Sequence, residues 1–260
     1  MSLQNPLGLF SLKGKTALIT GASTGIGLAV ATAFAHAGAN IVLGYNSSTK
    51  AIETAAELAK SANVQVLALH IPVADSTAVE DAFDQAVKMF STIDIVVSNA
   101  GVAWTAGELI APPTDEEWNQ IVNVNVNGCY HVAKCAGRLF KAQQSGSLIF
   151  TSSMSAQIVN IPQHQAAYNI SKAAVTAMSK NLAVEWAGFA RVNSVSPGYT
   201  ITEITSFADK QLRKEWTSMI PLRREASTSE LVGAYLYLAS DASTYTTGAD
   251  IIIDGGYTLV

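Results

Sequence analysis

The chain has 260 residues, of which 49% are hydrophobic and 14% are charged, and its formal net charge is -4. This length fits one α/β domain with a large core. A weakly acidic chain with scattered basic residues has no cationic field, so nucleic acid and anionic membrane are excluded as expected partners and a small molecule is favoured. So few charges also indicate a subunit that buries part of its surface in a homo-oligomer.

Two features bear on where the protein works. The opening segment MSLQNPLGLF has no positive n-region and no long apolar run, and no window reaches transmembrane length without polar residues. The two cysteines, Cys129 and Cys135, fit no metal-ligand spacing and are expected in one helix as buried, reduced thiols. We therefore predict a cytoplasmic protein without a metal site.

Short apolar runs rich in valine and isoleucine alternate with longer alanine-rich segments of helical period. In chain order the runs are TALIT (16–20), NIVLG (40–44), VQVLALHI (64–71), IDIVVS (93–98), SLIFTS (147–152), RVNSVS (191–196) and DIIID (250–254). This alternation is typical of βαβ units and of a parallel sheet buried on both faces. We predict a Rossmann-type doubly wound α/β sheet of about seven strands, in a single domain spanning 1–260, with ligands beyond the carboxyl ends of the strands.

A glycine-rich loop, TGASTGIG, follows the first predicted strand and contains Gly21, Gly25 and Gly27. Glycine lets the backbone pass close to a pyrophosphate and present its amides at a helix N-terminus. A tight turn that binds nothing is the alternative. The position of the loop, after the first strand of a βαβ series, favours a dinucleotide.

The end of the second strand indicates which dinucleotide is bound. An NAD-selecting site places Asp or Glu there for the ribose hydroxyls, whereas this chain reads LGYNSSTK and has no acid before Glu53. We therefore expect NADP(H). Asn46 and Ser47 can donate to a 2′-phosphate, and Lys50 can add positive charge. An ordinary polar loop is the alternative for each of the three residues.

The segment YNISKAAVTAMSKNLAVEWA (168–187) has the pattern of an amphipathic helix, and it places Tyr168 and Lys172 one turn apart on one face. A neighbouring ammonium and a nicotinamide cation both favour the phenolate form of a tyrosine. Lys172 is thus expected to activate Tyr168 as a proton carrier. Because this spacing is common on exposed helices, the pair alone is a weak signal.

Three further features strengthen the signal. The serine cluster TSSMS (151–155) follows the fifth run, where a hydroxyl could bind a substrate carbonyl, and SNAG (98–101) ends the fourth run with a glycine for close approach to a cofactor. Asn123, Asn125 and Asn127 lie in an otherwise helical stretch, where asparagine is disfavoured. Together these features predict a site.

In order and over nearly the whole chain, these motifs resemble those of the short-chain dehydrogenases/reductases: TGxxxGxG, NAG, an asparagine, a serine, YxxxK and PG. The resemblance implies hydride exchange between a nicotinamide and a carbonyl or carbinol carbon. It implies that Tyr168 is the general acid/base and that Lys172 favours its ionised form and holds the nicotinamide ribose. Asn125 would hold a proton-relay water, and Ser153 would polarise the carbonyl. Ser155 is the alternative serine, because it fits the commoner spacing to the tyrosine.

The resemblance also implies the cofactor contacts. Beside the tyrosine and the lysine of YxxxK, they are Gly21, Ser23, Thr24, Gly25, Ile26, Gly27, Tyr45, Asn46, Ser47, Val73, Asn99, Ala100, Gly101, Pro197, Gly198, Thr200 and Thr202. Pro72 stands where the family usually has an aspartate that binds adenine, so Val73 is expected to supply only apolar packing. Ser98 replaces the more usual asparagine. Thr24 stands where NADP enzymes often have arginine, so the cofactor choice depends on the second-strand loop.

The segment SSMSAQIVNIPQHQAAYNISKAAV and the pair YNSS are similar to the branch that contains fungal NADP-dependent mannitol dehydrogenases and sorbose or xylulose reductases. This similarity implies reduction of a ketose to a polyol, and the family's commonest assembly implies a homotetramer. Another small ketone, a diketone or a 3-ketoacyl substrate is the alternative. A non-catalytic NADP-binding regulatory protein is the alternative of a different class, which the filled catalytic positions argue against.

Overall fold

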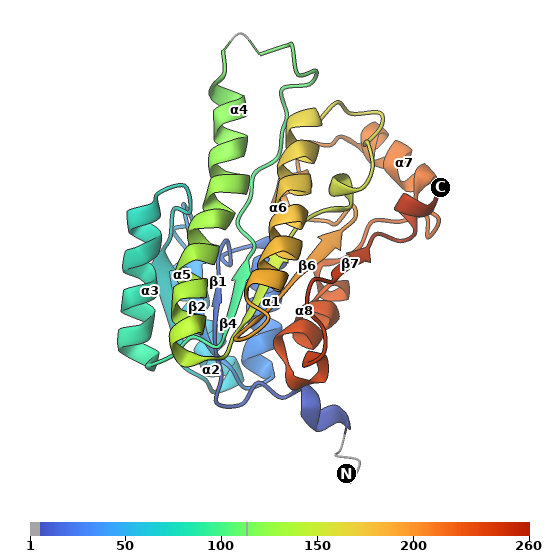
Figure 1. Ribbon diagram of the computed structural model, residues 1–260. Helices are drawn as coiled ribbons and strands as arrows, with labels where there is room; N and C mark the ends of the chain where they lie inside the picture. The colour runs from blue at the N-terminus through green and yellow to red at the C-terminus, as the bar shows by residue number, and fades with distance from the viewer. Residues whose placement is uncertain (1–5, 113) are drawn as a thin grey trace.

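The computed structural model describes residues 6–112 and 114–260. Seven parallel strands form one sheet in the order β3-β2-β1-β4-β5-β6-β7 (Figure 1). The strands are β1 (Thr16–Ile19), β2 (Asn40–Tyr45), β3 (Val66–His70), β4 (Ile95–Ser98), β5 (Ser147–Thr151), β6 (Arg191–Pro197) and β7 (Asp250–Ile253). Each predicted run corresponds to one strand, with β2 and β6 ending one residue beyond their runs, which confirms the predicted sheet. The predicted domain boundaries, 1–260, include residues 1–5 and 113, which lie outside the described residues.

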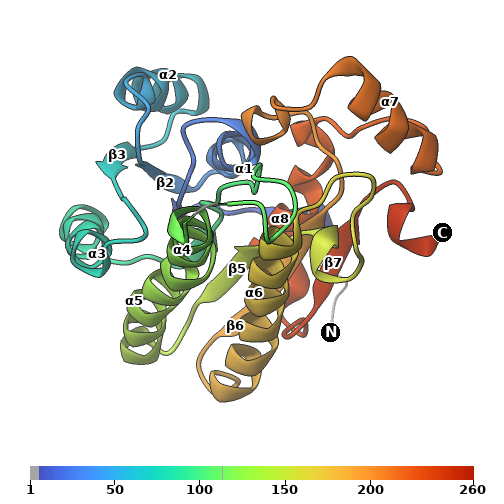
Figure 2. The same cartoon turned by 90° about the horizontal axis from the view of Figure 1, so that it is seen from above.

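Helices cover both faces of this sheet, which confirms the doubly wound arrangement (Figure 2). The α-helices are α1 (Gly25–His36), α2 (Ala51–Ala62), α3 (Ser76–Phe90), α4 (Glu116–Ile121), α5 (Gly128–Gln143), α6 (Ala166–Glu185), α7 (Lys210–Met219) and α8 (Val232–Ala239). A π-helix, η2 (Val122–Asn127), joins α4 to α5. The 3-10 helices are η1 (Pro6–Phe10), η3 (Met154–Ala156), η4 (Glu203–Thr205), η5 (Thr228–Glu230), η6 (Asp241–Ser243) and η7 (Tyr257–Leu259).

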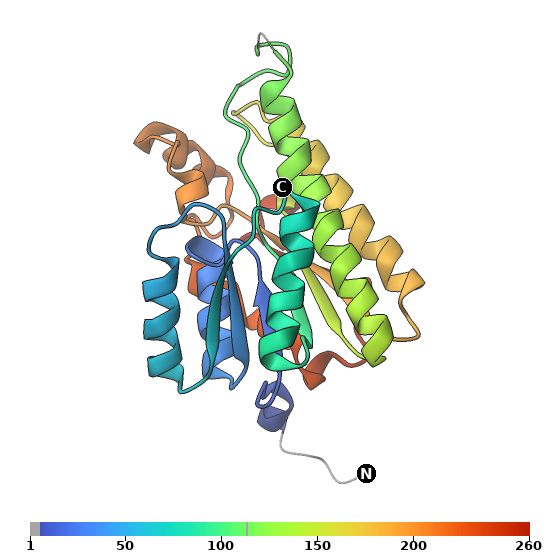
Figure 3. The same cartoon turned by 90° about the vertical axis from the view of Figure 1, so that its left-hand side faces the viewer.

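The sheet separates two hydrophobic cores. On one face α3, α5 and α6 lie side by side, and their core includes Phe83, Phe140 and Phe150 (Figure 3). On the other face α1, α2 and α8 form a core that includes Phe34 and Tyr235. Every residue of β1, β4 and β5 is buried. A strand buried on both faces has continuous apolar sequence instead of alternation, which is why these strands were predictable as short apolar runs.

The chain order of the strands reverses beside β1. This strand pairs with β2 on one side and with β4 on the other. In open parallel sheets such a reversal places ligands beyond the carboxyl ends of the central strands. Both cysteines lie in α5 and are buried, as predicted. Across residues 6–112 and 114–260, no helix combines the length and apolar composition that crossing a membrane requires.

Candidate active site

The glycine loop brings β1 close to the end of β4. Gly21 has a φ of 62°, and a β-carbon there would lie 2.9 Å from the Cα of Ala100. A β-carbon on Gly27 would lie 2.2 Å from the carbonyl oxygen of Gly21, so neither position accepts a side chain. Helix α1 begins at Gly25, and the side chain of Thr24 makes no capping hydrogen bond. The first amides of α1 are therefore available to an anion. Ser23 and Ile26 belong to the same turn.

Asn99 fixes this loop from the neighbouring strand. Its amide nitrogen donates to the carbonyl oxygens of Thr20 and Gly21 at 3.0 and 3.1 Å. In return, Thr20 Oγ1 accepts hydrogen bonds from the backbone N–H groups of Asn99 and Ala100 at 3.0 and 3.1 Å. Thr151 on β5 donates its hydroxyl to Asn99 Oδ1 at 3.1 Å. The Asn99 side chain thus holds the glycine loop to β4 and β5.

The loop after β2 leaves polar groups open to a ligand. Tyr45 is half-buried, and its ring centre lies 5.7 Å from that of His70. Asn46 and Ser47 are exposed, and their side chains make no hydrogen bond with any other described residue. Val73, after β3, is 6% exposed and belongs to a core cluster. Its side chain therefore packs in the apolar core beneath this edge of the sheet.

Tyr168 and Lys172 lie together at the start of α6, below the end of β5. Lys172 is 4% exposed, and its Nζ lies 5.7 Å from the centre of the Tyr168 ring. Nζ donates to the carbonyl oxygen of Thr151 at 2.9 Å. Within the described residues, Lys172 has no carboxylate partner and the Tyr168 hydroxyl has no hydrogen bond. Because a buried charge is costly without a partner, this unpaired ammonium marks a ligand site.

Asn125 lies in the π-helix η2 and is fully buried. Its Oδ1 accepts the N–H of Val102 at 2.9 Å, and its Nδ2 donates to the Val102 carbonyl and to Ser171 Oγ, both at 3.0 Å. Ser171 in turn donates to the carbonyl oxygen of Tyr168 at 2.7 Å. Both amide hydrogens are engaged, so the side chain of Asn125 braces the β4 loop against α6 and has no hydrogen left to donate to a water.

The β4 loop also passes close to the buried lysine. A β-carbon on Gly101 would lie 3.3 Å from Asn125 Oδ1 and 3.5 Å from Lys172 Nζ. These distances place the asparagine, the lysine and the loop around one point at the carboxyl edge of the sheet. Three of the residues predicted as catalytic from separate motifs, Asn125, Tyr168 and Lys172, therefore lie together here.

The two candidate serines differ in their partners. Ser153 Oγ accepts the backbone N–H of Ser155 at 3.1 Å and so caps η3. Ser155 Oγ accepts a hydrogen bond from the side-chain amide of Gln165 at 3.3 Å. In both cases the serine oxygen is an acceptor, so each hydroxyl keeps its proton for donation. Ser153 is 7% exposed and Ser155 is 4% exposed.

The segment after β6 reaches the glycine loop. Pro197 ends β6, and a β-carbon on Gly198 would lie 2.6 Å from the Cα of Asp254. Thr200 is buried and donates its hydroxyl to the carbonyl of Gly198 at 3.1 Å. The Thr202 methyl lies 3.5 Å from where a β-carbon on Gly25 would be. Of the predicted cofactor residues in this segment, Thr202 therefore stands beside the N-terminus of α1.

Sequence reasoning missed three residues that hold the site together, namely Thr20, Thr151 and Ser171. Ser171 lies 46 positions from its partner Asn125, and Thr20 lies 80 positions from its partner Ala100. Small hydroxyl residues at the end of a strand or beside the tyrosine were the available signal. Thr20 and Thr151 open the motifs TGASTGIG and TSSMS, but nothing in the sequence indicates that their hydroxyls bind Asn99 or Ala100.

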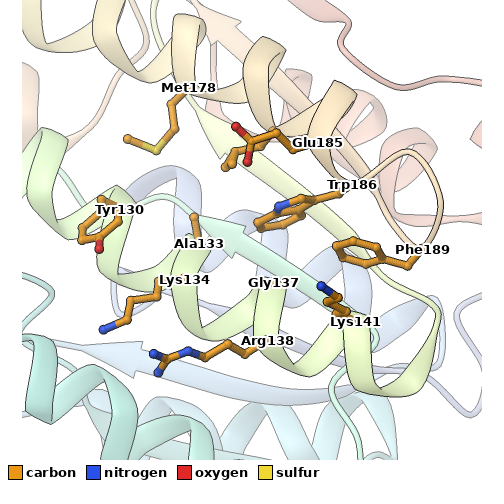
Figure 4. Close-up of a pocket in the computed structure, with 11 residues that line it drawn as sticks. Tyr130, Ala133, Lys134, Gly137, Arg138, Lys141, Met178, Glu185, Trp186 and Phe189 are labelled. Carbon is orange, nitrogen blue, oxygen red and sulfur yellow. The ribbon is translucent and has the colours of Figure 1, made fainter.

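A separate groove lies between α5 and α6 on the surface of the molecule (Figure 4). Its volume is about 460 Å³, and its lining residues are Tyr130, Ala133, Lys134, Gly137, Arg138, Lys141, Met178, Leu182, Glu185, Trp186 and Phe189. None of the predicted catalytic or cofactor residues lines it. In the part of the chain that the structure describes, no three His, Cys, Asp or Glu side chains gather as metal ligands.

A doubly wound sheet, a glycine loop before a free helix N-terminus and a paired tyrosine and lysine define a dinucleotide-dependent oxidoreductase. A sequence profile described as enoyl-(acyl carrier protein) reductase matches residues 21–258. The chain belongs to the short-chain dehydrogenase/reductase family, which confirms the resemblance seen in its motifs.

Named relatives are similar over almost the whole chain. A probable NADP-dependent mannitol dehydrogenase of Yarrowia lipolytica is 54% identical over 254 residues, which cover 98% of this chain and 91% of the relative. A sorbose reductase of Candida albicans is 54% identical over 256 residues, which cover 98% and 90%. Among solved structures, the NADPH-dependent 3-quinuclidinone reductase of Rhodotorula rubra has a TM-score of 0.95 and 43% identity, with 100% of this chain and 97% of that chain covered.

Proposed function

We propose that the chain is an NADP(H)-dependent oxidoreductase that interconverts a carbonyl and a secondary alcohol, and that it reduces a ketose such as sorbose, fructose or xylulose to a polyol. The observation that carries this proposal is the free hydroxyl of Tyr168 beside the buried, unpaired ammonium of Lys172. The names of relatives at 54% identity support the substrate class.

The residues present fit NADP(H). Free amides at the start of α1 suit a pyrophosphate, and the exposed Asn46 and Ser47 suit a 2′-phosphate, with no acidic side chain in the loop to repel it. The ammonium of Lys172 keeps donors for the hydroxyls of a ribose, because Thr151 accepts only one of its hydrogen bonds. When bound, NADPH supplies the hydride.

The protein groups then have distinct proposed roles. Tyr168 gives its proton to the carbonyl oxygen, and Lys172 favours the phenolate that remains. Ser153 donates a hydrogen bond from its hydroxyl to the same oxygen and so polarises the carbonyl. Asn125 holds the β4 loop and the first turn of α6 in register, which fixes the direction of the phenol. We assign the carbonyl contact to Ser153, the less buried of the two serines, whose hydroxyl hydrogen is not used within the described residues.

The segment between the serines and the tyrosine supports a hydroxyl-rich substrate. It carries four side-chain amides, from Asn160, Gln163, Gln165 and Asn169, that hydrogen-bond one another or a buried phenol. Amides offer both donors and acceptors, which match the hydroxyl groups of a sugar. An apolar ketone would leave the remaining N–H of Asn160 and of Asn169 without a partner.

Following NADPH absorbance tests this function. Sorbose, fructose and xylulose are expected to be reduced faster than diacetyl and an acetoacetyl thioester at equal concentration. Preference for the thioester would replace the ketose assignment with a 3-ketoacyl reductase. Tight NADPH binding without oxidation by any of the five compounds would favour the regulatory alternative.

We also propose a cytoplasmic homotetramer. The α5–α6 groove supports self-association, because an apolar floor that includes Met178 and Phe189 is bordered by basic residues on α5 and by Glu185 on α6. A two-fold axis across the groove would bring opposite charges together. The two unpaired, buried thiols support a reducing compartment. Light scattering on the purified protein tests the assembly, and any mass other than that of a tetramer would overturn it.

A further inference from the structure

A chain of side-chain hydrogen bonds runs from α7 to the segment before Tyr168. The indole N–H of Trp216 donates to Gln163 Oε1 at 2.8 Å. Gln163 Nε2 donates to the Tyr199 hydroxyl at 2.8 Å and to Gln165 Oε1 at 3.3 Å. Gln165 Nε2 then donates to Asn160 Oδ1 at 2.9 Å and to Asn169 Oδ1 at 3.0 Å.

In this series of hydrogen bonds, the indole is the only group that can act in one direction, as a donor. A tryptophan N–H can donate but cannot accept, whereas a side-chain amide can turn over and exchange its oxygen with its nitrogen. Trp216 therefore requires the oxygen of Gln163 to face it. The Gln163 nitrogen must then face Tyr199 and Gln165.

The orientation of Gln163 determines the orientation of the other three side-chain amides. Because Gln163 donates to Gln165 Oε1, the nitrogen of Gln165 faces the oxygens of Asn160 and Asn169. The nitrogens of these two asparagines must then point away from Gln165. Asn160 Nδ2 donates one hydrogen to Tyr199 at 3.1 Å, and Asn169 Nδ2 donates one to the carbonyl oxygen of Ile158 at 3.2 Å. Each amide group keeps a second N–H.

The residues at the α7 end are well anchored. Trp216 is 1% exposed, and its ring is stacked on that of Tyr199 with 4.2 Å between centres and 11° between planes. Tyr257 closes the stack edge-on. Burial raises the pKa of Tyr199, with the hydrogen bonds from Asn160 and Gln163 acting in the other direction, so its hydroxyl stays a neutral acceptor. The indole therefore holds one place and one orientation.

We propose that Trp216 and Gln163 are positioning residues for substrate recognition: they orient Asn160 and Asn169 so that both present N–H donors to the hydroxyl groups of the substrate. This inference rests on the proposed ketose reductase function. Trp216 belongs to α7, a helix outside the catalytic motifs. Through Trp216, this helix would set the direction of the hydrogen bonds that select a hydroxylated ketone over a ketone without hydroxyl groups.

Three variants test the proposal: Trp216→Phe, which keeps a ring on Tyr199 but removes the N–H, Gln163→Leu, and the double variant. Each is expected to raise KM for sorbose about tenfold, the effect of one or two misdirected hydrogen bonds, with kcat and the Kd for NADPH within about twofold of wild type. Reduction of cyclohexanone, which has no hydroxyl, is expected to be unchanged. Because Trp216 acts through Gln163, the double variant should match the single variants.

Gln157→Leu is the matched control. Gln157 lies in the same segment, but its amide donates to Asp250 at 3.1 Å and makes no hydrogen bond with Gln163, Gln165 or the two asparagines. An unchanged KM for sorbose in Trp216→Phe and Gln163→Leu, additive effects in the double variant, or an equal loss with cyclohexanone would overturn the proposal. If Trp216→Phe does not fold, Gln163→Leu provides the same comparison of substrates.

The outcome separates the proposal from the function on which it rests. A wild-type protein that reduces cyclohexanone but no ketose would refute the proposed function. The orientation proposal is then tested by inhibition of cyclohexanone reduction with sorbitol. Its inhibition constant should rise about tenfold in Gln163→Leu and stay constant in Gln157→Leu. No inhibition of the wild type by sorbitol would overturn the orientation proposal as well.

Discussion

The ammonium of Lys172 lies 5.7 Å from the centre of the Tyr168 ring and makes its hydrogen bond within the protein to a backbone carbonyl, that of Thr151. A cation held by a neutral group keeps its full charge for the phenol and for a ligand. The pair is therefore suited to move a proton, because no carboxylate among the described residues competes for the lysine.

Tyr168→Phe is expected to lower kcat by at least about a hundredfold, the usual contribution of a positioned general acid or base. The Kd for NADPH should stay within about twofold, since the hydroxyl makes no hydrogen bond inside the protein. Tyr245→Phe, on the exposed surface, is the control. A Tyr168→Phe enzyme with near wild-type turnover would remove the tyrosine from the mechanism.

Ser47→Asp is expected to weaken NADPH binding about tenfold or more and to leave NADH binding nearly unchanged. The new carboxylate would stand in an exposed loop without other acidic groups, where it would repel a 2′-phosphate but could accept hydrogen bonds from a ribose. Fluorescence titration with both dinucleotides measures the two constants. Asn181→Asp adds the same charge on α6 as a control. Equal weakening of both dinucleotides would contradict NADP(H) selection by this loop.

Glu203→Gln is expected to tighten NADPH binding about threefold at low ionic strength, and less at high salt. One carboxylate oxygen of Glu203 lies 3.5 Å from the position of a β-carbon on Gly25, close to the free amides of α1. A negative charge there opposes a pyrophosphate. Glu215→Gln removes a charge from α7 without altering the glycine loop and serves as the control. Weaker NADPH binding in Glu203→Gln would show that the carboxylate assists the cofactor.

Tyr235, in the core, is expected to make the stability of the protein depend on pH in the alkaline range. It is fully buried and hydrogen-bonds to Thr151 at 2.8 Å. Burial raises the pKa of Tyr235 above its ordinary value, although the hydrogen bond with Thr151 acts in the opposite direction. Because the folded protein binds the phenol proton more tightly than the unfolded chain, this stabilisation is complete below about pH 10 and is lost as the pH rises further.

Tyr235→Phe should therefore lose less stability than the wild type between neutral pH and the alkaline range. At neutral pH the variant is expected to be destabilised by about 1 kcal/mol, the value of one hydrogen bond. Urea unfolding at a series of pH values measures both effects, and Tyr245→Phe, on the surface, is the control. Parallel pH profiles for Tyr235→Phe and wild type would contradict the assignment.

The sheet and the principal site residues could be predicted because each leaves a local signal. Buried parallel strands appear as apolar runs, and the glycine loop, the asparagine and the tyrosine–lysine pair have fixed spacings. The motifs also occur in the order that the short-chain dehydrogenases/reductases have, which indicated the role of each residue. The free helix N-terminus and the unpaired ammonium give these motifs a physical basis that spacing alone lacked.

The bracing of the site could not be predicted. Thr20 and Asn99 are 79 positions apart, and Gln163 and Trp216 are 53 apart, so only the fold shows that they meet. The contact of the Asn99 amide with the glycine loop also left no signal in the sequence. Side-chain amides and hydroxyls have no periodic pattern, and their partners depend on distant strands and helices.

The π-helix η2 has a consequence for how this site can change. Hydrogen bonds in a π-helix span one residue more than in an α-helix, so α4 and α5 are out of phase, and Ile121 can face Ala167 and Tyr168 while Cys129 faces the sheet. Removing one residue between 122 and 127 would restore a regular helix and turn α4 by about 100°. Such a deletion would give a continuous α-helix in which Ile121 no longer packs against Tyr168, so we expect a more rigid helix and a lower turnover.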